Sequence, residues 1–164
     1  MTSFKPGPDT ARAFRDALGR FATGVTVVTC DSPLGPLGIT ANSFASLSLD
    51  PPLVLWSPAR ASRRFQAFAE ADHYAIHILS NAQQDLCRHF ASQGHDFGGL
   101  DWSANDKNVP LFENCLARFE CTRHAIHEGG DHAIIVGLVT SAEVGKGEPL
   151  LFAGGRYGGF DDGI

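Results

Sequence analysis

The chain has 164 residues, a formal charge of -5 at pH 7 and hydrophobic residues at 43% of its positions, so we expect one compact domain over residues 1–164. The acidic balance and the lack of long basic blocks argue against binding to nucleic acid. The longest apolar stretch, residues 133–139, is far shorter than the roughly 20 residues of a membrane span, and residues 1–9 lack a signal-peptide apolar region, so a cytoplasmic location is expected.

A helix is the first element that the sequence predicts. Asp9 or Thr10 can cap its start, and it should end within residues 19–23. Its apolar positions follow the spacing i, i+4 and i+7 and are occupied by Phe14, Leu18 and Phe21. We therefore expect an amphipathic helix with one apolar face.

Two strands frame a polar segment. Residues 24–30 (GVTVVTC) and 53–56 (LVLW) are rich in β-branched or large apolar residues, and the turn DSPLGP at residues 31–36 predicts a hairpin that leads into residues 37–52, LGITANSFASLSLDPP. The small uncharged polar residues of this segment are Thr40, Asn42, Ser43, Ser46 and Ser48. Neutral hydrogen-bonding groups suit a planar heteroaromatic ring, although Ser and Asn also fill ordinary hairpin connections.

The next elements are a short helix and a strand. Ser62 can cap a helix over residues 62–70 that buries Phe65 and Phe68. Residues 73–79 then predict a strand.

Two histidines of this strand fall on the same face. We interpret His73 and His77 as structural residues rather than ligands. After the strand, Ser80 and Gln83 form a capping box for a helix that runs to about residue 92. The apolar positions of this helix are Ala82, Leu86 and Phe90.

The last third of the chain is dominated by strands. Residues 116–122 and 132–144 predict two antiparallel strands joined at a turn over residues 128–130. Strands outnumber helices and no regular βαβ repeat occurs, so the predicted fold class is mainly β (α+β), a small closed or split β-barrel with peripheral helices. Four glycines surround Arg156 and Tyr157 near the end of the chain, and a flexible tail is one interpretation of them.

Several enzyme classes are disfavoured by missing motifs. No GxGxxG opens a helix after a strand, and no P-loop or GxSxG occurs, which argues against a Rossmann dehydrogenase and a serine hydrolase. The four cysteines lack a paired CxxC pattern and are expected to be reduced and mostly buried. His124, His127 and His132 with Asp131 match no common zinc spacing, so no metal site is predicted.

A resemblance to a known family rests on five segments in order: residues 37–52, 56–68 (WSPARASRRFQAF), 87–102 (CRHFASQGHDFGGLDW), 129–139 (GGDHAIIVGLV) and 149–160 (PLLFAGGRYGGF). They resemble the short-chain flavin reductase family, the flavin reductase-like FMN-binding proteins. The resemblance implies a split β-barrel and an NAD(P)H-dependent flavin reductase that transfers a hydride from NADH or NADPH to FMN or FAD. It also implies a homodimer and a separate monooxygenase that receives the reduced flavin.

The resemblance further implies which residues border the cofactor. Residues 40–43 would lie along the isoalloxazine, and the helix start at Ser62 would hold the flavin phosphate, with charge from Arg60, Arg63 or Arg64 unless these form an ordinary solvated helix face. The implied cofactor-binding residues are Thr40, Ala41, Asn42, Ser43, Ser57, Pro58, Ala59, Arg60, Ser62, Phe90, Ala91, Ser92, Phe97, Arg156 and Tyr157. Phe90 also continues the apolar face of its helix and is equally a candidate for the core.

The triplet Gly130, Asp131, His132 matches the family's GDH signature. It implies that His132 is the catalytic residue beside the nicotinamide, with Arg156 and Tyr157 lining the same mouth. A neutral imidazole can donate a hydrogen bond to a carboxamide. The alternative is a histidine that merely starts a strand.

Two other functions stay open. An FMN-binding protein without nicotinamide turnover is favoured by residues 95–97, which read His-Asp-Phe where the family commonly has Asp-Lys-Phe. The intact GDH triplet and the terminal Arg156 and Tyr157 favour the reductase. A split-barrel relative of the pyridoxamine oxidases would need a stronger cationic phosphate site than the sequence offers.

Overall fold

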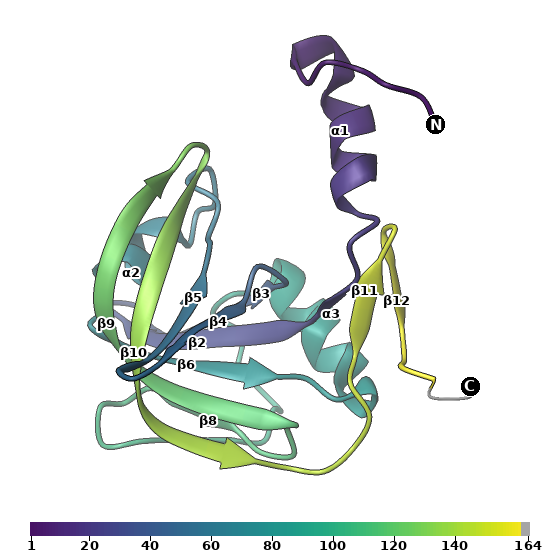
Figure 1. Cartoon of the computed structure of the whole chain (residues 1–164). Coiled ribbons are helices and arrows are strands. Elements are labelled where there is room, and N and C mark those ends of the chain that lie inside the picture. Colours follow the sequence, from purple (N-terminus) through teal and green to yellow (C-terminus); the bar gives the residue numbers. More distant parts are fainter. Residues whose placement is uncertain (162–164) are drawn as a thin grey trace.

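Figure 1 shows the computed structural model of the chain, which describes residues 1–161. Its main sheet contains β2 (Thr26–Ser32), β3 (Gly35–Ala41), β4 (Ala45–Leu49), β5 (Pro52–Trp56), β6 (His73–Ile78), β9 (Ala117–Gly129) and β10 (His132–Val144). These strands are antiparallel in the order β3-β2-β6-β9-β10-β5-β4, and the sheet curls around its core while its edge strands β3 and β4 stay unpaired with each other. This arrangement confirms the predicted split β-barrel.

Two smaller sheets and three helices complete the fold. β1 (Thr23–Gly24), β11 (Leu151–Ala153) and β12 (Arg156–Gly158) form one small sheet, and β7 (Trp102–Ala104) pairs with β8 (Pro110–Phe112). The helices are α1 (Ala11–Leu18), α2 (Phe65–Glu70) and α3 (Gln84–Ser92), with 3-10 turns at Pro8–Thr10 and Asn81–Gln83.

Local sequence signals placed most of these elements correctly. The β2–β3 and β9–β10 hairpins occur as predicted. The Ser80 capping box is present, with the Gln83 side-chain oxygen accepting from the Ser80 N–H at 3.1 Å, and α3 ends at Ser92. At the end of the chain, Gly154 and Gly155 have φ of 56° and 76° and turn β11 into β12, so the flexible-tail interpretation is wrong for this hairpin.

The start of α2 differs from the prediction. The helix begins at Phe65, because the Ser62 hydroxyl accepts from the Arg64 N–H at 3.2 Å and the Ser62 carbonyl accepts from the Phe65 N–H in a preceding turn. Phe68 is buried as expected, whereas Phe65 is only half-buried. The six-residue helix offers no N-terminal site at Ser62.

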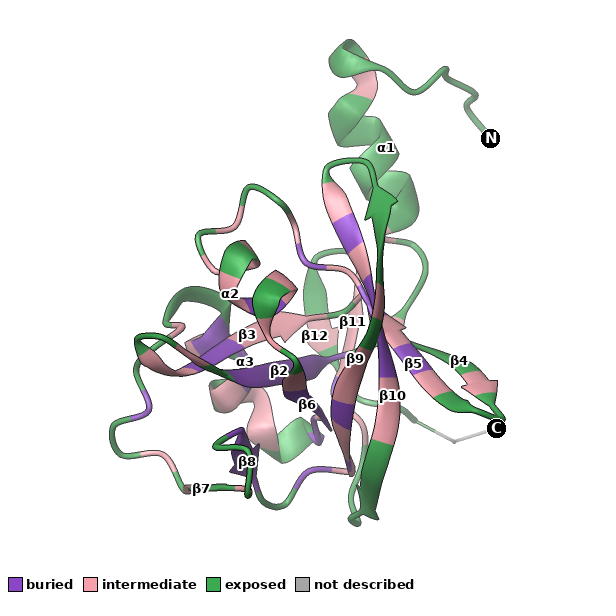
Figure 2. Cartoon of the chain, turned by 90° about the vertical axis from the view of Figure 1, so that its left-hand side faces the viewer, coloured by how far each residue is buried: buried purple, intermediate pink, exposed green. Residues whose placement is uncertain are grey.

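Two apolar clusters form the core of the barrel and of the α3 side. Trp56, Phe68 and Tyr74 belong to the first cluster, and Phe90 belongs to the second. Figure 2 shows the buried residues concentrated along β2 and β6, and those of β9 and β10 lie in the first half of each strand. A Cβ atom at Gly137 would lie 2.1 Å from the Tyr74 hydroxyl, so the ring requires a glycine at this position. All four cysteines are buried and free, which confirms their predicted state.

The helix α1 has an unexpected environment. None of its residues is buried, and Figures 1 and 2 show it standing away from the barrel. Thr10 lies at the N-cap position, but its hydroxyl donates to the carbonyls of Lys5 and Gly7 instead of accepting from the helix. Among residues 1–161, no helix is long and apolar enough to cross a membrane.

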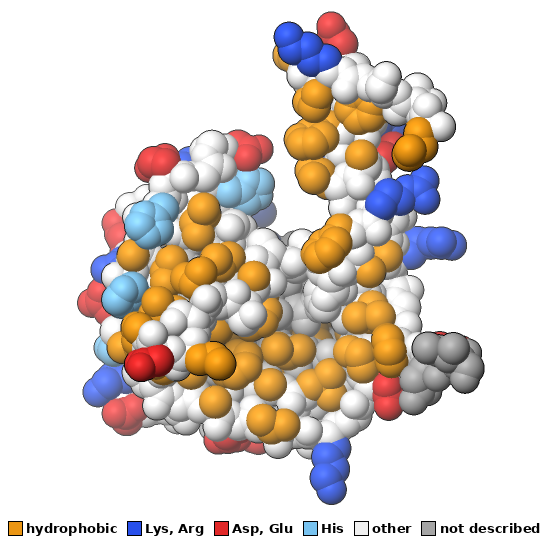
Figure 3. Space-filling model, in the orientation of Figure 1, with side chains coloured by type: hydrophobic (Ala, Val, Ile, Leu, Met, Phe, Trp, Pro, Cys, Tyr) orange, Lys and Arg blue, Asp and Glu red, His pale blue; other side chains and the backbone are white. Residues whose placement is uncertain are grey.

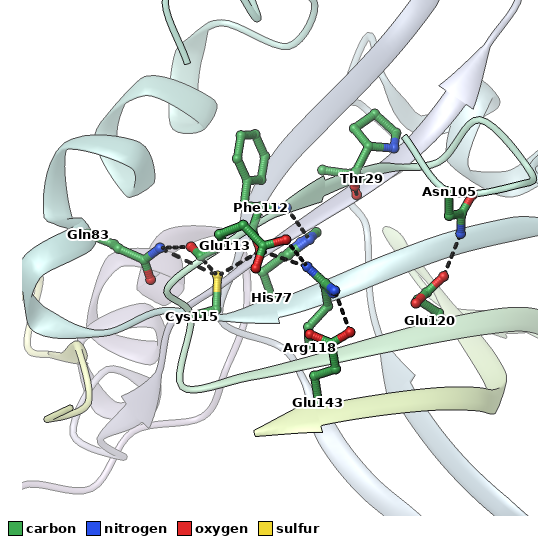
Figure 4. Close-up of polar contacts among 11 residues, drawn as sticks. Thr29, His77, Gln83, Asn105, Phe112, Glu113, Cys115, Arg118, Glu120 and Glu143 are labelled. Carbon is green, nitrogen blue, oxygen red and sulfur yellow. Dashed lines mark hydrogen bonds and ion pairs between the residues drawn. The ribbon is translucent and has the colours of Figure 1, made fainter. Parts of the chain in front are cut away.

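His77 is fully buried and bonded at both ring nitrogens. Its Nδ1 lies 3.0 Å from the Val27 carbonyl, which can only accept, so Nδ1 carries the proton and Nε2 accepts from the Phe112 N–H at 3.1 Å. Figure 4 shows this ring with Arg118 close by, held between Glu113 and Glu143. Burial lowers the pKa of His77 to about 4, and the nearby Arg118 charge also lowers it. The structural role predicted for His77 is confirmed.

This pKa makes the stability of the fold depend on pH. The folded-state value of about 4 lies below the roughly 6.5 of an unfolded histidine, so the unfolded chain binds more protons between these two values. The free energy of unfolding should therefore fall as the pH drops from 6.5 to 4, with His77 contributing up to about 3 kcal/mol. Urea denaturation at several pH values and NMR titration of the His77 ring measure this.

The exposed His124 supplies the control. His124→Gln should keep the pH dependence, whereas His77→Gln should reduce its slope between pH 6.5 and 4. A measured pKa near 6.5 for His77 would contradict the prediction.

Candidate functional site

The loop between β3 and β4 is anchored at both of its ends. The Thr40 hydroxyl donates to the Cys87 carbonyl of α3 at 2.6 Å. The Ser43 hydroxyl accepts from the Ser57 N–H at 2.9 Å and donates to the Ser57 carbonyl at 3.2 Å. Asn42 lies between these anchors and is exposed. The predicted ligand-binding segment thus forms a fixed, uncharged surface, which we call the cradle (residues 40–43).

A wall beside the cradle joins two of the predicted segments. The Arg60 N–H donates to the Asp131 carbonyl at 2.9 Å, Ala59 forms a β-bridge with His132, and the Pro58 carbonyl accepts from the N–H of residue 133 at 3.2 Å. Residues 57–60 and the GDH turn, far apart in sequence, therefore lie side by side.

The side chain of Arg60 is bonded within this wall. Its guanidinium pairs with Glu128 at 2.6 Å and lies over the Phe65 ring, 5.3 Å from the ring centroid. The predicted phosphate contact of Arg60 would have to compete with both partners.

His132 is oriented by its sequence neighbour. The Asp131 carboxylate lies 2.8 Å from the His132 Nδ1, and this hydrogen bond lowers the pKa of Asp131. Because the carboxylate accepts, Nδ1 carries the proton and Nε2 is the ring nitrogen left for a ligand. The His132 side chain is 44% exposed, which leaves it accessible.

A hollow of about 790 Å³ lies between residues 61–64 and 92–96. Ser62 and Arg63 line one side, Ser92 and His95 line the other, and Asp96 contributes a carboxylate. The volume falls in the range of small-molecule sites, roughly 300–1,000 Å³. This hollow brings together the predicted Ser62 and Ser92.

Arg64 borders the hollow, but its guanidinium is occupied by hydrogen bonds to backbone carbonyls. Its guanidinium donates to the carbonyls of Gly38 (3.0 Å), Phe90 (2.7 Å) and Ala91 (3.1 Å), which ties β3 to the end of α3. Burial lowers the pKa of Arg64, and neighbouring Arg63 lowers it further. Within residues 1–161, Arg63 forms no ion pair and is the exposed cation of this hollow.

Two predicted cofactor contacts are wrong as side-chain contacts. Phe90 has no exposed surface and Phe97 is 7% exposed, and their rings pack 5.0 Å apart in the second core cluster. The core interpretation of Phe90 holds because β3 leaves space for its ring at Gly38. Ala91 and Ser92, which follow Phe90, are exposed.

Tyr157, on the carboxy-terminal hairpin, contacts Cys87 of α3, the residue whose carbonyl accepts from Thr40. It packs on Phe152 and hydrogen-bonds with the Cys87 thiol, which raises the pKa of Tyr157 to about 12. Arg156 beside it is exposed. Figure 1 places β12 and the β9–β10 turn on opposite sides of the molecule. That Arg156 and Tyr157 line one mouth with His132 stays a prediction.

Sequence reasoning missed two residues that organise this site: Gly38 accommodates Phe90, and Cys87 links Thr40 to Tyr157. It had singled out Asp131 as part of the GDH triplet, and the structure adds that this carboxylate orients His132. A glycine between two apolar strand residues was the available signal for Gly38. Cys87 carried no comparable signal, because its partners are distant in sequence.

Comparison with known proteins identifies relatives over nearly the full chain. The family described as "Flavin reductase like domain" matches residues 18–161. The FMN reductase (NADH) SmoA of Agrobacterium fabrum is 57% identical over 157 residues, 96% of this chain and 90% of that protein. The flavin-dependent monooxygenase reductase subunit HsaB of Mycobacterium tuberculosis is 41% identical over 154 residues, 92% of this chain and 82% of that protein.

A solved structure agrees with these matches. The Streptomyces globisporus C-1027 NADH:FAD oxidoreductase SgcE6, in complex with NAD and FAD fragments, superposes with a TM-score of 0.89 and 36% sequence identity, covering 98% of this chain and 99% of that one.

The contact between Gly38 and Phe90 gives a testable prediction. A Cβ atom at Gly38 would lie 2.5 Å from two carbons of the Phe90 ring, so Gly38→Ala should force the ring to move and lower the free energy of unfolding by about 1–3 kcal/mol. Gly24→Ala is the matched control, since nothing lies within 4 Å of a Cβ there. Urea denaturation of both variants measures the difference, and equal stabilities would refute the argument.

Proposed function

The chain belongs to the flavin reductase like domain family, and from this we propose that it is an NADH-dependent flavin reductase, which transfers a hydride from the nicotinamide to FMN or FAD. The observation that carries the proposal is the 57% identity with an FMN reductase (NADH), which covers 96% of this chain. When bound, the flavin supplies the redox chemistry as the hydride acceptor, and the protein binds and orients the two rings.

The cradle fits the ring of a flavin. Thr40, Asn42 and Ser43 offer neutral donors and acceptors, as the pyrimidine edge of an isoalloxazine requires, and no charged side chain occurs among residues 40–43. Thr40 and Ser43 are held by their own hydrogen bonds, so this surface is already organised for binding.

The hollow beside the cradle fits the phosphate end of the cofactor. Arg63 provides a positive charge, Ser62 and Ser92 provide hydroxyl donors, and His95 lines the same wall. This assignment replaces the helix start at Ser62, because α2 begins only at Phe65. Among the residues that line the hollow, the carboxylate of Asp96 would repel an anion.

We propose that His132 orients the nicotinamide. Its Nδ1 proton is held by Asp131, so Nε2 can accept a hydrogen bond from the carboxamide NH₂ group. The docking of residues 57–60 against the GDH turn supports this role, because Ala59 forms a bridge with His132 and Ser57 bonds to Ser43 of the cradle. The main contribution that binding residues can make to hydride transfer is to hold the two rings in the right orientation, about 3–3.5 Å apart.

We further propose that the protein serves a separate oxygenase as its reductase component and that it is a homodimer of one-domain chains. The oxygenase partner is supported by the 41% identical reductase subunit of a flavin-dependent monooxygenase. The cytoplasmic location expected from the sequence stays a prediction.

A turnover assay tests the function directly. The purified chain, mixed with catalytic and then with excess FMN or FAD, should oxidise NADH with a rate that depends on added flavin, followed as the loss of nicotinamide absorbance. Binding of flavin without oxidation of NADH or NADPH would instead establish the FMN-binding protein considered above, and no flavin binding would overturn both functions.

Replacement of His132 tests the nicotinamide contact. His132→Ala should raise the KM for NADH about tenfold, the effect of losing one hydrogen bond, while the Kd for flavin changes less than about twofold. His124→Ala, an exposed histidine on the same strand pair, is the control and should leave both constants unchanged. Unaltered kinetics in the His132 variant would remove this residue from the site.

A further inference from the structure

His95 has one ring nitrogen engaged and one free. Its Nδ1 lies 3.1 Å from the Pro36 carbonyl, which can only accept, so Nδ1 carries the proton of the neutral ring. Its Nε2 has no hydrogen-bond partner among residues 1–161. Because the side chain is exposed and lines the hollow, Nε2 is the nitrogen that a ligand in the hollow can reach.

The protonation state of this ring decides what Nε2 offers to a ligand. In the neutral ring Nε2 carries a lone pair, which repels the oxygens of a phosphate group. In the protonated ring both nitrogens donate, so Nδ1 keeps its bond to Pro36 and Nε2 becomes a charged donor. Hydrogen bonds from a charged donor to a phosphate are roughly twice as strong as neutral ones. A phosphate in the hollow therefore favours the protonated ring.

The positive charge already present in the hollow is too small for a phosphate. Arg63 and Arg64 lie on the side opposite His95. The Arg64 guanidinium is bonded to three backbone carbonyls, and Arg63 is exposed without an ion pair in the described chain. A phosphate monoester carries a charge of about -1.5 to -2 at pH 7. A protonated His95 supplies the second positive charge from the facing wall.

Two carboxylates lie near His95, and neither forms an ion pair with it within residues 1–161. Asp96 follows it in the chain, and the Asp96 Oδ1 accepts from the Gly98 N–H at 3.1 Å, within its own turn. Asp31 is exposed on β2, opposite the β3 residue to which His95 bonds. The neighbouring His89 has its Nε2 2.5 Å from the Asp96 carbonyl. A protonated His95 thus keeps its charge for a ligand.

We propose that His95 binds the phosphate group of the flavin as a protonated imidazole, together with Arg63, and that this contact selects phosphorylated flavins over riboflavin. The proposal rests on the proposed function and identifies a residue that recognises the phosphate. The step is non-covalent: Nε2 takes one proton from the solvent when the flavin binds and returns it when the flavin leaves.

Binding of FMN and of riboflavin tests this role, because the two ligands differ only in the phosphate. Calorimetry at about pH 7.5, in buffers of different ionisation enthalpy, counts the protons taken up. At this pH the phosphate is already doubly charged, since its second pKa is about 6, and contributes little to the count. FMN should take up part of a proton and riboflavin none. No uptake with FMN, or equal uptake with both ligands, would overturn the proposal.

Substitutions of His95 separate its charge from its hydrogen bond. His95→Asn keeps an amide donor for Pro36 and removes Nε2, so the Kd for FMN should rise about tenfold at about pH 6.5, while the Kd for riboflavin changes less than about twofold. His95→Lys should restore FMN binding without proton uptake, because an ammonium group is already charged at neutral pH. Unchanged FMN affinity in His95→Asn, or no rescue by His95→Lys, would refute the role.

A gain of affinity gives a test that a damaged fold cannot imitate. Asp96→Asn removes the carboxylate from the hollow and keeps an oxygen that can accept from Gly98. The Kd for FMN should fall about threefold, the size of one exposed charge interaction, and the Kd for riboflavin should stay the same. An FMN affinity that does not increase would count against the hollow as the phosphate site.

A histidine outside the hollow supplies the matched control. Figure 3 shows histidine side chains gathered over β9 and β10, the strands that carry His124, His127 and His132. None of these three lines the hollow. His124→Asn should leave the FMN affinity and the proton uptake unchanged. Loss of the uptake in this variant would show that another histidine takes the proton and would overturn the proposal.

Flavin-dependent NADH oxidation, measured on the same protein, separates this role from the proposed function. Turnover with FMN but without proton uptake refutes only the role of His95. A protein that binds neither FMN nor FAD refutes the proposed function itself.

Discussion

The contact between the Gly38 backbone and the Phe90 ring is the constraint on which the site depends. Because β3 carries no side chain at Gly38, α3 can pack its aromatic residue directly on the strand. That packing brings the Cys87 carbonyl within 2.6 Å of the Thr40 hydroxyl and the end of α3 within reach of Arg64. One missing side chain therefore positions the cradle and one side of the hollow.

Some arginines near the site are bonded within the protein, and one is free to meet a ligand. Arg64 donates hydrogen bonds to three backbone carbonyls where β3 meets α3, and Arg60 pairs with Glu128 beside the GDH turn. Arg63 lies between them in sequence and is exposed. Adjacent residues thus have opposite roles, because neighbouring side chains of a turn point toward different surroundings.

Local patterns in the sequence predicted much of the fold. The Ser80 capping box and the β2–β3 and β9–β10 hairpins depend on residues close in sequence, and the spacing of His73 and His77 predicted a structural role for His77. The same reasoning misplaced the start of α2, because the hydrogen bonds of Ser62 to Arg64 and Phe65 form a turn that the pattern of capping residues does not reveal. It also could not show that the apolar face of α1 has no partner in its own chain.

The sequence by itself determined which chemistry the chain carries: an uncharged cradle at residues 40–43, the GDH triplet and the order of the family segments. Only the tertiary structure decided which of these residues can touch a ligand. Phe90 and Phe97 lie in the core instead, whereas Gly38 and Cys87 are positioning residues of the site. The reason is physical: burial and hydrogen-bond partners are set by contacts between segments far apart in sequence, which no local pattern of residue types specifies.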